Sequence, residues 1–166
     1  MTSVANAAHL PPLGTHQRAE VGHELQALLV ELVDLSLLGK QLHWTVVGPL
    51  FRPLHQQLDE LVDSWRELAD TVAERAVAVG FLPDGQSSAI AAATPVRGVE
   101  RAELEDRVVV RELTSRLAEV AERARGRMDR LGELDAASQD VVIEVVRAVE
   151  KQLWMIRSQF PEAHPH

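Results

Sequence analysis

Apolar residues recur every three or four positions along most of the chain, which is the spacing of amphipathic α-helices. The first apolar stripe ends at Gly48-Pro49, where glycine permits a turn and proline suits the start of the next helix. The second stripe begins at Phe51 and ends at Gly80 and the residues that follow it. Two long helices are therefore predicted in the N-terminal half. Their apolar positions are Val21, Leu25, Leu28, Leu32, Leu35, Leu42 and Val46 in the first, and Phe51, Leu54, Leu58, Leu61, Trp65, Leu68, Val72, Ala76 and Val79 in the second.

The C-terminal half contains two further stripes, which predict helices over roughly 99–130 and 137–160. Residues 86–98, between the second and third helices, are small, polar or rich in alanine, and predict a crossover with a short helix around Ser88–Ala93. No segment alternates with a period of two, so no strand is expected. The pattern predicts an all-α arrangement, namely a four-helix bundle with one long connection. The stripes are Leu113, Leu117, Val120, Ala124 and Met128, then Val142, Val145, Val149, Leu153, Ile156 and Phe160.

The length of 166 residues suits one domain with a substantial core. We expect the bundle to occupy residues 16–160. An N-terminal tail is expected over 1–15, with Thr15 as a candidate helix N-cap, and a short C-terminal tail over 161–166.

Composition narrows the classes of function. The net charge of −8 argues against a protein that wraps nucleic acid by bulk charge. The absence of cysteine excludes disulfides, thiolate catalysis and cysteine-based zinc sites. No apolar run approaches the ~18 residues of a membrane span. No secretory signal is visible at the N-terminus, so we expect a cytoplasmic protein.

Side chains that commonly bind metals form one stripe on the second predicted helix. His55 and Asp59 are four residues apart, as are Asp70 and Glu74, so each pair lies on one helix face. At 100° per residue, Asp59 and Asp70 differ by only about 20° in azimuth. His43, near the end of the first helix, has a similar depth to His55 in an antiparallel hairpin. We therefore expect His43, His55 and Asp59 to converge.

Asp70 and Glu74 cannot join them within one chain. Eleven residues of helix separate Asp59 from Asp70, which is about 16 Å, whereas metal–ligand bonds are only about 2 Å long. Either the chain carries two half-sites, or a second chain supplies the missing half across a two-fold axis. Imidazole and carboxylate ligands without sulfur suit iron, manganese or zinc. The alternative is a solvated helix face, on which Asp70 and Glu74 pair with Arg66 or Arg75.

Several motifs resemble those of the Dps family, the mini-ferritins named for DNA protection during starvation. The likeness covers roughly residues 16–160. The intervals of 12, 4, 11 and 4 residues between the five candidate ligands are those of the family. The motifs are Lys40-Gln41-Leu42-His43-Trp44-Thr45-Val46-Val47-Gly48, then Phe51, Leu54-His55, Leu58-Asp59-Glu60, Asp70, Ala73-Glu74-Arg75 and Glu150-Lys151-Gln152-Leu153-Trp154-Met155-Ile156-Arg157.

The resemblance implies a ferritin-like four-helix bundle that assembles as a hollow homo-dodecamer, with ferroxidase sites across its two-fold interfaces. His43, His55 and Asp59 would come from one subunit, and Asp70 and Glu74 from its neighbour. Members of the family bind Fe(II), oxidise it preferentially with hydrogen peroxide rather than O₂, and store ferric mineral inside the shell. Removing iron and peroxide together suppresses hydroxyl radicals, so the resemblance also implies protection of DNA from oxidative damage.

The resemblance extends to residues around the candidate site. Trp44 would lie near it, either as an electron donor or radical sink, or as interface packing. Asp135, Asp140 and Glu144 resemble the acidic residues that line the three-fold pores of the family, where carboxylates attract cations. Acidic residues near a helix N-terminus are also stabilised by the helix dipole without any pore. Asp140 is the best candidate for a pore residue.

DNA binding is where the chain departs from the best-known members, some of which use a lysine-rich tail. The sequence has only two lysines, Lys40 and Lys151, so weak DNA binding is expected. The rival functions are a nucleoid protein that coats DNA, with iron oxidation secondary, and a cage whose polar stripe is an interface without active metal. The arginines of the third helix form either a basic patch or a salt-bridged exposed face. They are Arg116, Arg123, Arg125, Arg127 and Arg130, interleaved with Glu119, Glu122 and Asp129.

Overall fold

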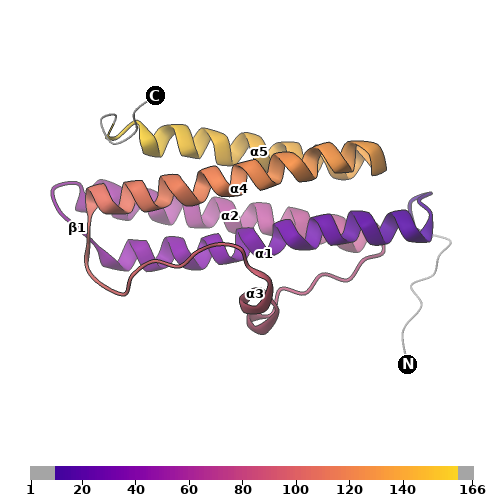
Figure 1. The fold of residues 1–166 in the computed structure, drawn as a ribbon, viewed down its shortest axis with the longest axis horizontal. Helices are drawn as coiled ribbons and strands as arrows, with labels where there is room; N and C mark the ends of the chain where they lie inside the picture. The colour runs from indigo at the N-terminus through magenta and orange to yellow at the C-terminus, as the bar shows by residue number, and fades with distance from the viewer. Residues whose placement is uncertain (1–9, 161–166) are drawn as a thin grey trace.

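Four long helices pack as two antiparallel hairpins in the computed structural model, which describes residues 10–160 (Figure 1). A short helix, α3, lies in the crossover between the hairpins. The predicted all-α bundle with one long connection is therefore confirmed, as is the short helix in that connection. The helices are α1 (Thr15–Thr45), α2 (Phe51–Ala78), α3 (Ser87–Ala93), α4 (Asp106–Leu134) and α5 (Ala136–Arg157). The outer parts of the two predicted tails, 1–9 and 161–166, lie outside the described residues.

The core lies between the four long helices, each of which turns one apolar stripe inward. Trp65 is the largest of the fully buried side chains. Burial of one leucine contributes roughly 1.5–3 kcal/mol, so these stripes hold the hairpins together. The other large buried side chains are Leu25, Leu28, Leu32, Leu35, Leu42, Leu54, Leu58, Leu113, Leu117, Leu131 and Ile156.

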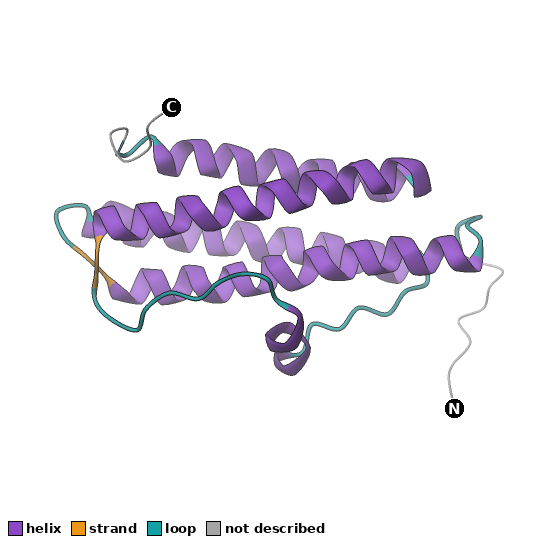
Figure 2. Ribbon diagram, viewed as in Figure 1, coloured by secondary structure: helices purple, strands orange, loops and turns teal. Residues whose placement is uncertain are grey.

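The crossover ends in a short parallel strand pair, which corrects the expectation of no strand. Val46–Val47 (β1) pairs with Leu104–Glu105 (β2), as Figure 2 shows. Two residues are too few for a periodic pattern, so the sequence could not indicate them. The pairing also corrects the start of the third long helix, which begins at Asp106 rather than near residue 99. The Asp106 carboxylate accepts a hydrogen bond from the backbone N–H of Leu50 at 2.9 Å, tying the crossover to the α1–α2 turn.

Two glycines make the predicted turns after α1 and α2. Gly48 has φ of +118° and Gly80 has φ of +87°, a region that favours glycine. The predicted cap of α1 is wrong by one residue, because Gly14 is the N-cap and Thr15 is already helical. The backbone N–H of Gly14 donates to the side-chain oxygen of Gln17 at 3.3 Å, which is the second bond of a capping box, and no side chain of the N-cap residue caps the helix.

The arginines of α4 form ion pairs, which confirms the salt bridges, but Arg116 and Arg127 are buried, so the predicted exposed face is wrong for these two. Their partners are mostly glutamates of other helices rather than the interleaved acidic residues; Glu119, for example, pairs with Arg97 of the crossover. Glu31 of α1 is fully buried and bridges two arginines, at 2.9 Å and 2.6 Å. A buried carboxylate needs such partners. The pairs are Arg116–Glu112, Arg123–Glu31, Arg125–Glu150, Arg127–Glu31 and Arg130–Glu24.

Asp135 joins the two hairpins at the start of α5. Its carboxylate accepts hydrogen bonds from the backbone N–H of Ser138 at 3.1 Å and from Arg75 of α2 at 2.6 Å. Burial raises the pKa of Asp135, but the hydrogen bonds from Ser138 and Arg75 outweigh it and hold the pKa below its ordinary value. The side chain therefore acts as a helix N-cap and as one half of an ion pair.

Among the described residues, no helix is both long and apolar enough to span a membrane.

Asp135→Ala is expected to lower the free energy of unfolding by about 1–2 kcal/mol, because α5 loses its cap and Arg75 loses its partner. Asp140→Ala, at an exposed position on the same helix, is the control and should change it by less than about 0.5 kcal/mol. Urea denaturation at pH 7 measures both.

The effect of Asp135 should also depend on pH. Its pKa is lowered on folding, so its contribution is complete above the ordinary pKa and is lost as the pH falls through the lowered value. The difference in free energy of unfolding between the wild type and Asp135→Ala should therefore shrink below about pH 4. A difference that stays constant into strong acid would show that the carboxylate charge is not involved.

Candidate metal centre

His43 and His55 face each other across the α1–α2 hairpin. Their rings stack with centroids 3.6 Å apart and planes at 21°. Nδ1 of His43 lies 2.8 Å from the carbonyl oxygen of His55, and Nδ1 of His55 lies 2.9 Å from the carbonyl oxygen of His43. The two residues therefore lie at the same depth, as their positions on either side of the turn predict.

The reciprocal hydrogen bonds fix the protonation pattern of both rings. A carbonyl oxygen only accepts hydrogen bonds, so each Nδ1 must carry the proton and donate. In the neutral imidazole the lone pair then lies on Nε2, which is the nitrogen that remains able to bind a metal ion. A ring whose other nitrogen donates to a backbone carbonyl is held in orientation as well as in tautomer, as in many metal sites.

Asp59 of α2 adds the carboxylate. Its Oδ1 lies 3.3 Å from Nδ1 of His43 and accepts a hydrogen bond from Nζ of Lys40 at 2.6 Å. That hydrogen bond is the main reason why the pKa of Asp59 lies below its ordinary value; the positive charge that His43, His55 and Lys40 can carry lowers it further, against a smaller opposing effect of burial. About half of the carboxyl side chain remains exposed.

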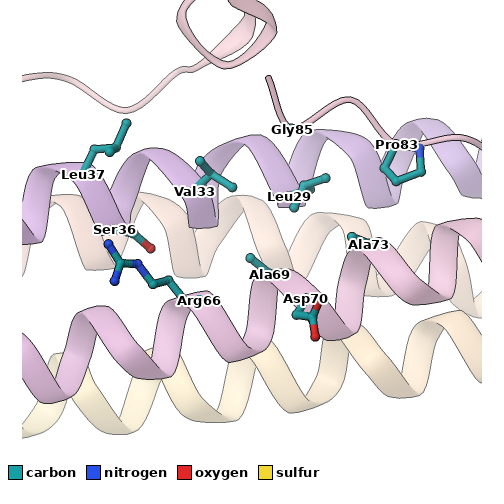
Figure 3. A pocket seen from close by; sticks show the side chains of 10 residues that line it. All are labelled: Leu29, Val33, Ser36, Leu37, Arg66, Ala69, Asp70, Ala73, Pro83 and Gly85. Carbon is teal, nitrogen blue, oxygen red and sulfur yellow. The ribbon is translucent and has the colours of Figure 1, made fainter. Parts of the chain in front are cut away.

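Asp70 and Glu74 lie further along α2, and both are exposed. Asp70 lines a groove of about 360 Å³ between α1 and α2. In Figure 3 this aspartate and Arg66 lie on α2 with Ala69 between them, while Leu29, Val33 and Leu37 line the α1 side. The structure thus brings together His43, His55 and Asp59. Asp70 and Glu74 remain apart from them, further along the same face of α2.

This face of the hairpin also exposes large apolar side chains. Leu37 is 57% exposed and Trp44, seven residues later on α1, is 69% exposed. Val77, seven residues after Asp70 on α2, is 52% exposed. Residues seven apart lie on one side of a helix, so Leu37 and Trp44 share one side of α1, and Val77 lies on the same side of α2 as Asp70. Exposed apolar side chains gathered on one face are typical of surfaces that another molecule covers.

The remaining predicted residues occupy two places. Trp44 lies next to His43, with its ring centroid 5.9 Å from Nζ of Lys40. At the far end of the bundle, Asp140 and Glu144 are exposed on α5, whereas Asp135 is engaged with Ser138 and Arg75.

Within residues 10–160 of one chain, no group of three or more histidine, aspartate or glutamate side chains is arranged to hold a metal ion. His43, His55 and Asp59 form hydrogen bonds and a ring stack, which is one side of a site rather than a closed cage. Two imidazoles and a carboxylate suit iron, manganese or zinc and leave coordination positions for further ligands. Further carboxylates would have to be supplied before this arrangement could hold a divalent cation.

Lys40 is the site residue that sequence reasoning missed. The sequence does contain a signal for it, because Lys40 lies three residues before His43 and so shares its helix face.

The sequence and the fold of this chain are similar to those of known proteins. The sequence matches the ferritin-like domain over residues 23–163. DNA protection during starvation protein 2 of Deinococcus radiodurans is 32% identical over 152 residues, which cover 92% of this chain and 63% of that protein. DNA protection during starvation protein of Mycolicibacterium smegmatis is 33% identical over 156 residues, covering 93% of this chain and 84% of that protein.

A solved structure agrees with the sequence matches. The tetragonal form of Mycobacterium smegmatis Dps superposes with a TM-score of 0.87 at 31% identity, covering 91% of this chain and 93% of that one. The fold and the sequence matches thus define a ferritin-like protein. Within that class, the chain belongs to the Dps family.

Close packing of α1 on α2 beside the site predicts the effect of a small substitution. A Cβ added at Gly39 would lie 2.6 Å from Val62 and 2.7 Å from Trp65. Gly39→Ala should therefore force the helices apart one turn before His43 and lower the free energy of unfolding by about 1–3 kcal/mol. In Gly126→Ala, the control, the Cβ would meet only the end of the Arg130 side chain, at 3.3 Å.

Gly126→Ala is expected to raise stability by up to about 1 kcal/mol, through the higher helix propensity of alanine. Thermal unfolding of both variants measures the contrast. Equal stabilisation by the two substitutions would show that the hairpin is not tightly packed at Gly39.

Proposed function

We propose that the chain is a ferroxidase subunit that oxidises Fe(II) at dinuclear sites shared by two copies and stores the ferric product inside a hollow dodecamer. The observation that carries the proposal is the divided ligand set. His43, His55 and Asp59 form one half of a site on an exposed apolar face, and Asp70 and Glu74 lie about 16 Å further along α2.

A two-fold axis between two copies of this face completes the site. Packing α2 against its copy in the antiparallel sense brings the histidine end of one chain to Asp70 and Glu74 of the other, and generates two equivalent sites. The exposed side chains of Leu37, Trp44 and Val77 would be buried by the same contact. We assign Trp44 to this packing, in preference to a role as electron donor or radical sink.

The chemistry follows from the ligand set. Three carboxylates and two neutral imidazoles bind Fe(II), and their negative charge favours the ferric product. Hydrogen peroxide, the preferred oxidant in this proposal, accepts two electrons: two Fe(II), one H₂O₂ and two protons give two Fe(III) and two H₂O. Dioxygen is the slower alternative oxidant. Because Fe(II) and peroxide are consumed together, fewer hydroxyl radicals form, and DNA in the cytoplasm is protected chemically.

A nucleoid protein that coats DNA is the alternative function. The names of the relatives are compatible with it, but the charges of this chain favour the ferroxidase. The α4 arginines that sequence reasoning considered as a basic patch are paired with glutamates. Paired charges release few counterions on meeting phosphate, so only weak binding to DNA is expected. A gel shift at low salt that shows tight, salt-sensitive binding would favour the alternative.

The ferroxidase proposal predicts the behaviour of a double variant. His55→Ala with Asp59→Ala should reduce the initial rate of peroxide-driven Fe(II) oxidation at least about tenfold, because one half of each site loses two ligands. The rate is measured as ferric absorbance after anaerobic loading with Fe(II), while light scattering reports the particle size. The control, His16→Ala with Asp129→Ala, changes the same residue types at exposed positions. An unchanged rate in the site variant, with assembly intact, would refute the site assignment.

Asp140 and Glu144 are proposed to attract iron to a pore of the shell. Asp140→Asn with Glu144→Gln should slow iron uptake several-fold at low salt, because a ring of carboxylates focuses the field on an approaching cation. Added salt should reduce the difference by screening. The affinity of the ferroxidase site for Co(II) should stay unchanged. Uptake as fast as in the wild type at low salt would exclude these residues from the path.

A further inference from the structure

Asp106, the first residue of α4, holds the start of α2 from a distant part of the chain. Its Oδ2 accepts a hydrogen bond from the backbone N–H of Leu50 at 2.9 Å, and its Oδ1 accepts one from the backbone N–H of Arg107 at 2.7 Å. Only 6% of the residue is exposed. A Cβ added at Gly48 would lie 2.9 Å from the same carboxylate, so Asp106 is packed directly against the α1–α2 turn.

The same carboxylate serves two helices whose N-cap residues do not cap them. Leu50 and Glu105 are the N-cap residues of α2 and α4, and neither uses its own side chain as a cap. Asp106 lies at the N-termini of both helices, where the helix dipoles favour a negative charge. Close packing does not replace its hydrogen bonds, because a groove of about 590 Å³ lies beside it, lined by the turn, the start of α4 and Phe160.

A row of contacts leads from this carboxylate to the two histidines of the candidate site. Phe51 follows Leu50 in the chain, and its ring centroid lies 5.0 Å from that of His55. The His55 ring stacks on that of His43, and each histidine binds the carbonyl oxygen of the other through Nδ1. A movement of the first turn of α2 would therefore shift His55 relative to His43.

We infer that Asp106 is a positioning residue for the metal site: by holding the N-terminus of α2, it keeps Nε2 of His43 and Nε2 of His55 in the geometry that binds a divalent cation, without touching the cation itself. The inference rests on the proposed function, because it assumes that these histidines are metal ligands. It implies that the loss of Asp106 weakens cation binding more than an equally destabilising change elsewhere in the bundle.

The first measurement is hydrogen–deuterium exchange of the assembled, metal-free protein, read by mass spectrometry. In Asp106→Ala, the amides of residues 50–55 should exchange at least about tenfold faster, because the N–H of Leu50 loses its acceptor and the first turn of α2 opens more often. Residues 66–78, at the other end of α2, should exchange as in the wild type.

The second measurement is titration with Co(II), which has the charge of Fe(II) and whose visible absorption reports the geometry of its ligands. Asp106→Ala should weaken Co(II) binding about tenfold and change the visible spectrum of bound Co(II), as the loss of residues that orient metal ligands does. Asp106→Asn keeps the shape of the side chain and one acceptor oxygen, so it should weaken binding by a smaller factor.

Thr94→Val is the matched control. The Thr94 hydroxyl donates to Asp34 at 2.6 Å and accepts from the backbone N–H of Val96 at 3.0 Å, so this variant also unties the crossover from α1, but nine residues before His43. Its Co(II) affinity should equal that of the wild type. Equal losses of affinity in Thr94→Val and Asp106→Ala, or an unchanged affinity in Asp106→Ala, would overturn the positioning role.

Light scattering checks that every variant assembles. Failure of the proposed function would give a different result, because it concerns the ligands themselves. If His55→Ala with Asp59→Ala retained the wild-type affinity for Co(II), the site assignment would be wrong and the inference would fall with it.

Discussion

The rigidity of a single α-helix is the constraint on which the rest of this structure depends. Because α2 rises about 1.5 Å per residue, Asp59 and Asp70 cannot reach one metal ion, although they lie on the same helix face. On the proposed function, the chain carries two incomplete ligand sets rather than one site. Assembly and chemistry would then be coupled, because the contact that would bury Leu37, Trp44 and Val77 would also bring the missing carboxylates.

The α1–α2 hairpin fixes the positions of His43 and His55 relative to each other. Gly48 makes the turn, the short β1–β2 pair and Asp106 fix it, and Gly39 lets the helices approach closely. The hydrogen bonds between His43 and His55 then hold both rings in one tautomer before any cation arrives. Such preorganisation means that little reordering accompanies binding.

The sequence predicted the parts of the fold that follow from a periodic pattern of apolar and polar residues. The helices, the crossover and the convergence of His43 with His55 follow from periodic spacing and from the position of one turn. The sequence could not indicate the two-residue strands, which have no period, or the partners of the α4 arginines, which depend on how the helices face each other. For Lys40 the spacing indicates the helix face that it shares with His43, but not its contact with Asp59, which crosses between helices. How the two halves of the site meet also depends on a second chain, whose position no single sequence pattern encodes.

The most direct measurement mixes two inactive variants. One chain carries His55→Ala with Asp59→Ala, and the other carries Asp70→Ala with Glu74→Ala. If each site is shared across a two-fold interface, half of the interfaces in a random co-assembly are mixed, and each mixed interface holds one intact site of two. Peroxide-driven Fe(II) oxidation should then recover to about a quarter of the wild-type rate, while each variant alone stays inactive. Mixed particles that remain as inactive as their parents would contradict a site shared between chains.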